Sequence, residues 1–230
     1  MEKVLVGCPT SFHKEYALNE YAKAVKNLSY KNYDVLLVDN SPDGNYLRKI
    51  KSLNLNAIKG PYFESARDRI VTSRNILKDE SIKNYDYLLS LEQDVIPPRD
   101  IIERMLKHNK KVITGVYFAR NIIQGEKKLI PLAYKEIPSE NELPDMRPLN
   151  EFELNKDLTK VISCGLGCVL IHKDILKWIN FRYEKDKDSF DDRFFCIDLY
   201  RKKIPIYCDT SIICKHLILN RHYQWKDIKK

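Results

Sequence analysis

The stretch LLSLEQDVIPP, residues 88–98, places two carboxylates between a short apolar run and a pair of prolines. The apolar run is typical of a buried strand, and the prolines, which lack an amide N–H, cannot continue a central ladder. Side chains alternate along a strand, so Glu92 and Asp94 are predicted to point to one side and Gln93 to the other. The stretch therefore predicts two acids near the carboxyl end of a buried strand.

Paired carboxylates in this position have two interpretations. Ligands of open α/β sheets bind outside the carboxyl ends of the strands, and carboxylates there are suitable ligands for Mg²⁺ or Mn²⁺. Alternatively, both acids are solvated at the exit of the strand, and Asp100 caps the next helix. The stretch alone favours neither interpretation, so the choice depends on the rest of the chain.

Strand-like and helix-like segments alternate on both sides of this stretch. Apolar runs predict strands for KVLVGC, YDVLLVD, NAIKG, YDYLLSLE and KVITGVYFA, which begin at residues 3, 33, 56, 85 and 111. Helical spacing of apolar residues predicts helices over residues 18–28, 46–53, 65–78 and 99–108. This alternation predicts an α/β protein with a mostly parallel central sheet and helices on both faces.

The pattern changes after Arg120. Residues 121–157 are polar, rich in proline and poorly periodic, and they predict a long connection of mobile loops that could cover a substrate. Beyond them, KVISCGLGCVLIHK predicts a bent strand or a strand pair, DRFFCIDLYRKK a helix, and IPIYCD and SIICKHL two more strands.

The composition excludes several classes of protein. A hydrophobic share of 43% with only 7 glycines is that of a globular chain, not of a disordered or fibrous one. Every apolar run is much shorter than the roughly 20 residues that cross a bilayer, and MEKVLVGCP lacks the apolar core of a signal peptide. The six cysteines form no C-x-x-C pair and no zinc-like pattern with histidines. Most lie in apolar runs, which predicts a reduced, cytoplasmic protein.

The net charge of +8 is compatible with a nucleic acid, an anionic membrane or a phosphorylated substrate as partner. The basic residues are dispersed, and the chain has neither an RNP-type aromatic motif nor a helix-turn-helix signature. We therefore expect no nucleic acid partner. The cluster KDIKK at residues 226–230 could provide a peripheral contact with the inner face of a membrane.

Other candidate residues each have a plain structural alternative. Asp39 ends the second predicted strand and could accept hydrogen bonds from a ribose or a base, but DNSPDG would form a turn whatever the function. Pro9 and Thr10 follow the first strand in GCPTSF, which is neither a Walker A loop nor a dinucleotide fingerprint. They could shape a pocket or a plain loop.

Charged residues further along the chain are equally ambiguous. Arg67, Arg69 and Arg74 lie on one predicted helix, and one of them could bind a diphosphate through two hydrogen bonds. Otherwise this is an ordinary surface helix that carries three arginines. Asp191 and Asp192 precede a predicted helix, where an N-cap is the default role of an aspartate. His216, in SIICKHL, is by itself more typical of a core or surface position than of a ligand.

The order of these segments resembles that of inverting, family-two-like GT-A glycosyltransferases, which transfer a sugar from a nucleotide-sugar donor. The resemblance is carried by VLVGCPTSF, YDVLLVDNSPDG, TSRNILKD, YDYLLSLEQDVIPP, CGLGCVLIHKDIL and DDRFFCIDLYRKKIPIYCDTSIICKH. It covers nearly the whole chain outside residues 120–160. It implies one GT-A, Rossmann-like domain with a smaller mixed β region on the acceptor side. Residues 1–119 would be the nucleotide-sugar-binding half, and residues 120–230, with a long loop region at 120–160, the acceptor-binding and catalytic half.

The resemblance also implies roles for individual residues. The nucleotide-sugar site would contain Pro9, Thr10, Asp39, Asn40, Arg74 and Gln93. A Mn²⁺ or Mg²⁺ ion would be bound by Asp94, with Glu92 and His216 as further ligands. Asp192 would be the general base. The sequence departs from the family at Glu92, which stands where the family has an aspartate, so direct ligation by its longer side chain is left open.

These roles imply a metal-assisted transfer. The divalent ion would neutralise the departing nucleoside diphosphate, and Asp192 would take a proton from an acceptor hydroxyl that attacks the opposite face of the sugar. Such a single displacement inverts the anomeric configuration. The acceptor would be a glycan, a lipid-linked molecule or a protein.

Two other functions compete with this one. A sugar-nucleotide pyrophosphorylase or another nucleotidyltransferase would need a glycine-rich basic loop after the first strand, and GCPTSF is not one. A non-catalytic module that binds carbohydrate or nucleic acid would not need Asp39, Asp94, Asp192 and His216 together.

Overall fold

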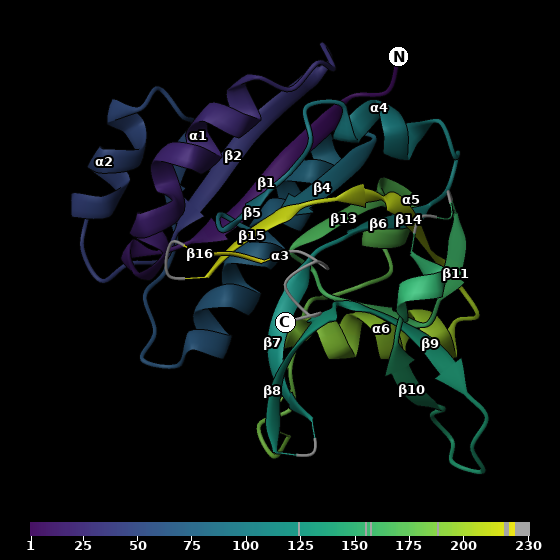
Figure 1. Cartoon of the computed structure of the whole chain (residues 1–230). Helices are drawn as coiled ribbons and strands as arrows, with labels where there is room; N and C mark the ends of the chain where they lie inside the picture. The colour runs from purple at the N-terminus through teal and green to yellow at the C-terminus, as the bar shows by residue number, and fades with distance from the viewer. Residues whose placement is uncertain (124, 155, 157, 188, 219–220, 224–230) are drawn as a thin grey trace.

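The computed structural model describes residues 1–223 except 124, 155, 157, 188, 219 and 220 (Figure 1). Its centre is an eight-stranded sheet with the order β11-β14-β6-β13-β4-β1-β2-β3. The bounds are β1 Val4–Thr10, β2 Tyr33–Asp39, β3 Ala57–Lys59, β4 Tyr87–Leu91, β6 Val112–Val116, β11 Thr159–Val161, β13 Cys168–His172 and β14 Ile206–Ile213. Strands β1 to β4 are parallel to one another, whereas β13 runs antiparallel to both β4 and β6. The predicted α/β class with a mostly parallel sheet is confirmed.

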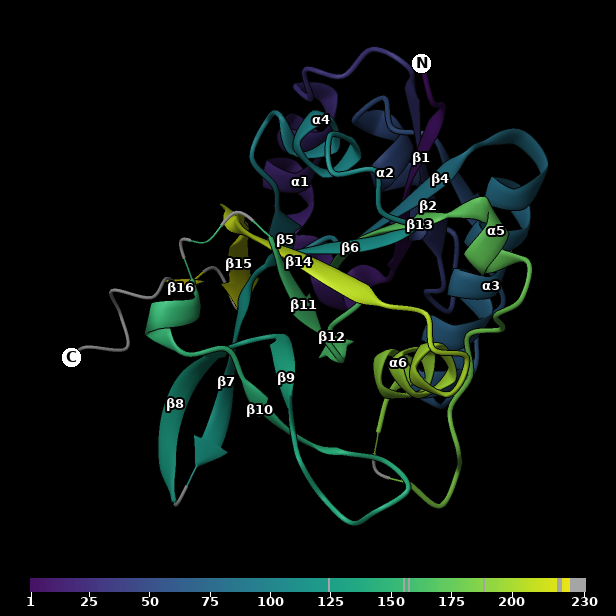
Figure 2. The same ribbon diagram turned by 90° about the vertical axis from the view of Figure 1, so that its right-hand side faces the viewer.

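Helices cover both faces of this sheet. Their bounds are α1 Leu18–Lys26, α2 Asn45–Ser52, α3 Ala66–Asn84, α4 Ile101–Leu106, α5 Lys173–Leu176 and α6 Asp191–Arg201, with short 3-10 turns η1 Phe12–Ala17 and η2 Glu151–Glu153. One core joins α1, α2 and α4 to Val4 and Val6 of β1, and the other joins α3, α5 and α6 to Leu5 of the same strand. Figure 2 shows α1 and α4 on one side of the strands and α3 and α5 on the other. The alternation of apolar residues along β1 therefore serves both cores.

The end of β4 differs from the prediction. The strand stops at Leu91, and the amide of Val95 donates to the carbonyl of Glu92 at 2.9 Å, so residues 92–94 form a turn. The next two residues, β5 Val95–Ile96, belong to a different, three-stranded sheet with β15 Lys215–Ile218 and β16 Arg221–Tyr223. The predicted strand alternation therefore does not decide where Glu92 and Asp94 point, although both lie at the carboxyl end of β4 as expected.

The prediction of long loops over residues 120–160 is wrong for most of that segment. It contains or borders β7 Phe118–Ile123, β8 Glu126–Pro131, β9 Ala133–Ile137 and β10 Asp145–Pro148. β7 pairs with β8, and β9 pairs with both β10 and β12 Ser163–Cys164. Strands β7 to β10 lie below the central sheet in Figure 1. Short strands that pair mainly with each other carry little periodicity, so the sequence pattern missed them. The division of the chain at 119/120 remains a prediction.

The helix start at residue 191 also corrects a prediction. The N-cap of α6 is Phe190, and both Asp191 and Asp192 lie inside the first turn of the helix. Neither is the capping residue, although negative side chains in a first turn complement the helix dipole. All six cysteines are free and buried, in keeping with their predicted role as small apolar residues. Within the described ranges, the helices are too short or too polar to cross a membrane.

Candidate active site

A pocket of about 220 Å³ lies at the carboxyl ends of β1, β2 and β4. Five residues predicted for a nucleotide-sugar or metal site line it, namely Pro9, Thr10, Asn40, Glu92 and Gln93. The lining also contains Arg69, one of the three arginines considered for a diphosphate, and His13 and Lys14, which were not predicted to take part. Parallel strands bring their carboxyl ends to one edge of a sheet, which is why segments so far apart in the chain meet here.

Asp39 and Asn40 are buried at the end of β2, with 0% and 3% of their surface exposed. The Oδ1 atom of Asp39 accepts a hydrogen bond from the amide of Ser41 at 2.9 Å, the turn contact that DNSPDG predicts. Its Oδ2 atom is buried and has no hydrogen-bond partner among the described residues. The side-chain Nδ2 atom of Asn40 donates to the hydroxyl of Ser73 at 3.1 Å. Asp39 thus combines the predicted turn with a free acceptor atom.

Gln93 is buried, and both polar atoms of its side-chain amide form hydrogen bonds within the protein. Its Oε1 atom accepts from Thr10 and, at 2.9 Å, from the hydroxyl of Tyr46. Its Nε2 atom donates to the carbonyl of Lys14 at 2.5 Å. These bonds fix the loop after β1 against the turn after β4. Gln93 also lines the pocket, and its direct contact with a nucleotide sugar stays a prediction.

Asp94 is the centre of a cluster of donors. Its Oδ2 atom forms an ion pair with Lys14, accepts from the hydroxyl of Tyr16 at 3.1 Å and lies 3.5 Å from Nε2 of His216. Burial raises the pKa of Asp94, but His216 and Lys14 outweigh that effect and lower it to about 2. Its Oδ1 atom is buried without a partner among the described residues. Asp94 is therefore ionised under physiological conditions and has one oxygen free.

His216 reaches Asp94 from β15. Its Nδ1 atom donates to the carbonyl of Phe118 at 2.5 Å, which leaves Nε2 facing Asp94. The ring stands edge-on to Tyr117, with the ring centroids 5.3 Å apart. Burial lowers the pKa of His216, but the hydrogen bond and charge of Asp94 outweigh it, so the pKa is raised overall. The structure thus brings together Asp94 and His216, as predicted.

The third predicted metal ligand points elsewhere. Oε1 of Glu92 pairs with the guanidinium of Arg74 at 3.2 Å. No three His, Cys, Asp or Glu side chains among the described residues are arranged to hold a metal ion. Glu92, Asp94 and His216 therefore do not fit a metal site made of protein ligands, and the prediction of Mn²⁺ or Mg²⁺ stays a prediction.

Arg74 connects the two acidic segments of the site. Its side chain is only 1% exposed and donates to Asp191 at 2.7 Å, to Ser90 at 2.5 Å and to the carbonyl of Leu166 at 3.3 Å. The predicted contact of Arg74 with a donor diphosphate does not agree with this burial. Its role in the structure is to hold Asp191 and Glu92 in place.

Asp192 is the one predicted catalytic residue. Burial, together with the charges of Asp191 and Glu92, raises its pKa to about 6, against the opposing effects of the Arg193 amide and Arg74. Its Oδ1 atom accepts from the amide of Arg193 at 2.7 Å. A carboxylate whose pKa lies near neutrality is suited to take up a proton during a reaction.

The two glycines of CGLGC leave room for the side chain of Tyr117. Its hydroxyl accepts a hydrogen bond from the amide of Gly167 at 2.9 Å. A Cβ atom at Gly165 would lie 2.1 Å from that hydroxyl, and one at Gly167 would lie 2.7 Å from the ring. The glycines therefore let a buried tyrosine approach the backbone next to His216.

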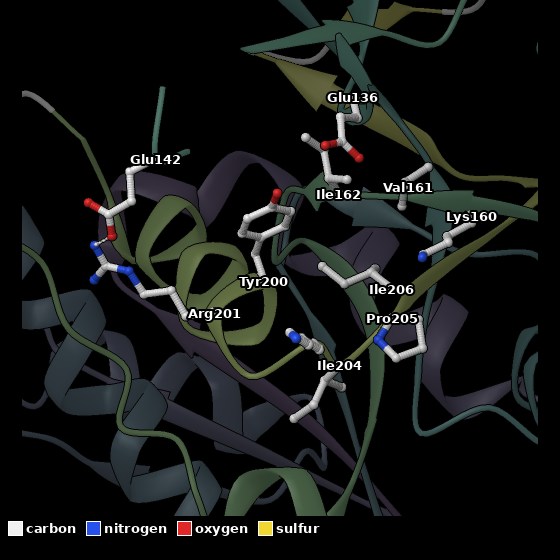
Figure 3. A pocket seen from close by; sticks show the side chains of 11 residues that line it. Glu136, Glu142, Lys160, Val161, Ile162, Tyr200, Arg201, Ile204, Pro205 and Ile206 are labelled. Carbon is white, nitrogen blue, oxygen red and sulfur yellow. Dashed lines mark hydrogen bonds and ion pairs between the residues drawn. The ribbon is translucent and has the colours of Figure 1, made fainter. Parts of the chain in front are cut away.

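A second cavity, of about 430 Å³, lies at the carboxyl end of α6 (Figure 3). Tyr200, Ile204 and Lys160 contribute to its wall. Arg201, also in the wall, forms an ion pair of 3.1 Å with Glu142. Its lining differs wholly from the predicted site, and we assign it no role.

Lys14, Tyr16 and Tyr117 were missed by the sequence analysis. Lys14 and Tyr16 lie in the turn η1, where no periodic or motif signal marks them. Their importance depends on contact with Asp94, which lies 80 and 78 positions further along the chain. Tyr117 lies in a run that the sequence pattern predicts as one strand. In the structure this run is divided between β6 and β7.

Comparison of the sequence with protein-family models and with curated proteins gives no match. Solved structures do match. The chain is similar to A197 from STIV, with a TM-score of 0.53, 18% identity, and coverage of 95% of this chain and 87% of that one. It is also similar to S. aureus TarS 1-349 in complex with UDP-GlcNAc, with a TM-score of 0.59, 12% identity, and coverage of 93% and 57%.

These similarities concern the fold. The architecture is the GT-A type of Rossmann-like α/β fold, with the mostly parallel sheet and covering helices described above. The chain spans 57% of the TarS 1-349 chain that it matches.

Proposed function

We propose that this protein is a glycosyltransferase that moves a sugar from a nucleoside diphosphate sugar to an acceptor hydroxyl. The observation that carries the proposal is the pair of contacts that links the start of α6 to the pocket: Arg74 pairs with Asp191 and with Glu92, and Glu92 lines the pocket. Asp192, next to Asp191, has a pKa raised to about 6. The TarS structures that share the fold were solved with UDP-GlcNAc and with UDP, which supports a nucleotide-sugar donor.

The nucleoside would lie in the pocket lined by Pro9, Thr10 and Asn40. The unpartnered Oδ2 atom of Asp39 supports a hydrogen bond from the base or the ribose, because a buried acceptor without a donor is costly. The diphosphate would extend from there towards Lys14 and Glu92, on the same pocket wall.

Asp192 would act as the general base. In its ionised form it takes the proton of the acceptor hydroxyl as that oxygen forms a bond to the anomeric carbon. The bond from this carbon to the diphosphate oxygen breaks at the same time, and its electron pair leaves with the nucleoside diphosphate. Such a single displacement from the opposite face inverts the anomeric configuration.

The departing diphosphate gains negative charge and needs a cation beside it. A Mn²⁺ or Mg²⁺ ion at Asp94, carried with the donor, is one proposed source of that charge, and the unpartnered Oδ1 atom of Asp94 supports it. Bound there, the ion would act as a Lewis acid. The ligand set of the protein itself is incomplete, as described above.

The acceptor and the location of the protein remain predictions. A glycan, a lipid-linked molecule and a protein are all compatible with the proposed chemistry. The basic segment 226–230, predicted to contact the inner face of a membrane, lies outside the described residues. A cytoplasmic location is likewise a prediction.

The experiment that tests the proposed function is a screen of UDP-, GDP- and dTDP-sugars. Hydrolysis or transfer of one sugar, with release of the nucleoside diphosphate, is the expected result, and NMR of the product would show the inverted anomer. Sugar 1-phosphate and NTP, offered in parallel, cover the pyrophosphorylase alternative. Binding of random DNA without donor binding would instead support a non-catalytic module.

A further inference from the structure

We propose that Lys14 supplies the positive charge that the donor diphosphate needs, in the place that a protein-bound divalent ion would otherwise take. The inference rests on the proposed function and names a binding residue for the diphosphate group. It is motivated by the mismatch between the predicted metal ligands and their arrangement in the structure.

Lys14 is placed between the buried acid and the pocket. It lines the 220 Å³ pocket together with Glu92 and Asn40, while its ammonium group forms an ion pair with Asp94. The side chain of Asp94 is 3% exposed and that of Lys14 is 37% exposed. The carboxylate therefore lies behind the ammonium group, and the partly exposed lysine is the member of the pair that a ligand in the pocket would meet.

The turn after β4 holds Lys14 from two directions. Nε2 of Gln93 donates to the backbone carbonyl of Lys14 at 2.5 Å, and the next residue, Asp94, holds the ammonium group. Gln93 is itself held by Thr10 and Tyr46. A lysine positioned in this way loses less conformational freedom when it binds an anion, which favours affinity.

Besides Lys14, Arg69 lines the pocket, and it donates to the backbone carbonyls of Phe63 and Glu64. The groups nearest to Lys14 have partners within the protein. Tyr16 and His216 share Oδ2 of Asp94 with Lys14, and Glu92 is paired with Arg74. A divalent ion on Oδ2 of Asp94 would have to displace the ammonium group. An ion on the unpartnered Oδ1 would share one carboxylate with that ammonium group, and the like charges would repel. An anionic diphosphate meets the opposite situation, since it would be attracted to the lysine, and lysine is a common phosphate ligand.

The alternative is that Lys14 only anchors η1 to the turn after β4. In that case its ammonium group would be neutralised by Asp94 and would contribute nothing to diphosphate binding. The two roles differ in their dependence on the phosphate groups of the ligand, and this difference can be measured.

The experiment measures binding of UDP, GDP and dTDP by calorimetry, with EDTA or with Mn²⁺, to the wild type, Lys14→Met and Lys49→Met. Lys49 is the control, because it forms an exposed ion pair with Glu15, the neighbour of Lys14 in η1. The corresponding monophosphates are measured in parallel, and thermal unfolding checks that each variant is folded.

The expected result is that the wild type binds at least one nucleoside diphosphate in EDTA, within about threefold of its affinity in Mn²⁺. Lys14→Met should lose about tenfold or more in affinity for the diphosphate, with a smaller loss for the monophosphate, while Lys49→Met should bind as the wild type. Wild-type binding that requires Mn²⁺, or equal losses for both nucleotides in Lys14→Met, would overturn the role of Lys14 and leave the proposed function intact. Failure to bind any of the nucleotides under either condition would overturn both.

Discussion

Lys14 and Asp94 form an ion pair at the carboxyl end of β4, although they lie 80 positions apart in the chain. The pair joins the turn η1, which follows β1, to the turn that follows β4. Because both strands are central in the sheet, the contact fixes two of the four segments that line the pocket. Asp94 therefore has a structural role in addition to any role in donor binding.

Removing the charge of Asp94 should destabilise the protein. Asp94→Asn leaves the ammonium of Lys14 and the ring of His216 without their common anion, and we expect a loss of about 1–3 kcal/mol in the free energy of unfolding. Urea unfolding measures this loss. Glu15→Gln is the control, because it breaks an exposed ion pair with Lys49 that should contribute less than about 1 kcal/mol. Equal stability of the two variants would contradict the structural role.

The second prediction concerns turnover. Asp192→Asn keeps the shape of the side chain but cannot take up a proton, so kcat should fall by about 10²–10⁴-fold with little change in donor affinity. Asp79→Asn, an exposed position on α3, is the control and should be active. Steady-state kinetics together with donor binding by calorimetry give both quantities. An active Asp192→Asn variant would remove Asp192 as the base.

The third prediction is the pH dependence of this step. The pKa of Asp192 is raised to about 6, and the base must be ionised, so kcat should fall as the pH drops below about 6 and level off above it. The fall should approach tenfold per pH unit. It is measured at saturating donor and acceptor. Residual turnover of Asp192→Asn should lack this inflection, and an unchanged profile in the variant would assign the titration to another group.

The fourth prediction concerns the buried pair of Arg74 and Asp191. Either Arg74→Met or Asp191→Asn removes one partner of a pair whose side chains are 1% and 3% exposed, and we expect a loss of about 3–5 kcal/mol in the free energy of unfolding. The sequence pattern predicted Asp191 as a residue of the helix start, where a substitution would have only a small effect on stability. The buried pair with Arg74 predicts a large effect instead. Chemical denaturation measures the loss.

Arg182 provides the comparison for that pair. Its side chain is 37% exposed and pairs with Asp198 at 2.8 Å, so Arg182→Met should cost less than about 1 kcal/mol. Losses of similar size for Arg74→Met and Arg182→Met would show that burial does not strengthen the Arg74 pair.

The fifth prediction tests the contact of Tyr117 with the glycine-rich strand. Gly165→Ala would place a Cβ atom 2.1 Å from the tyrosine hydroxyl, so the ring or the backbone must move, at a cost of about 1–3 kcal/mol. Thermal unfolding measures the change. In Gly44→Ala the nearest atom to the new Cβ is the end of the Arg48 side chain at 3.4 Å, and the effect should be small. Unchanged stability of Gly165→Ala would contradict the contact.

Much of the fold follows from local patterns in the sequence. The spacing of Leu18, Tyr21 and Val25 predicts α1, and all three are buried in the structure. The apolar runs of β1, β2 and β4 predict a sheet covered on both faces. Successive side chains of a strand point to opposite faces, and in these runs both the odd and the even positions are apolar. The acids Asp39 and Asp94 were found at strand ends because turn formers and prolines mark those ends in the sequence.

The tertiary structure decided which partner each of these side chains meets. Arg74 lies 117 positions from Asp191, and that contact makes it a buried structural residue where the sequence predicted a ligand for the donor. The strands β7 to β10 escaped prediction because their pairing, rather than their periodicity, defines them.

Lys14 illustrates why such contacts cannot be predicted from the sequence. Its charge is visible in the sequence, but its position beside Asp94 results from the order of β4 and β1 in the sheet and from the bonds of Gln93. Local periodicity determines which faces of a segment are buried, since burial depends on the spacing of apolar residues. The meeting of two turns at one edge depends on the packing of the whole sheet, and only the tertiary structure contains it.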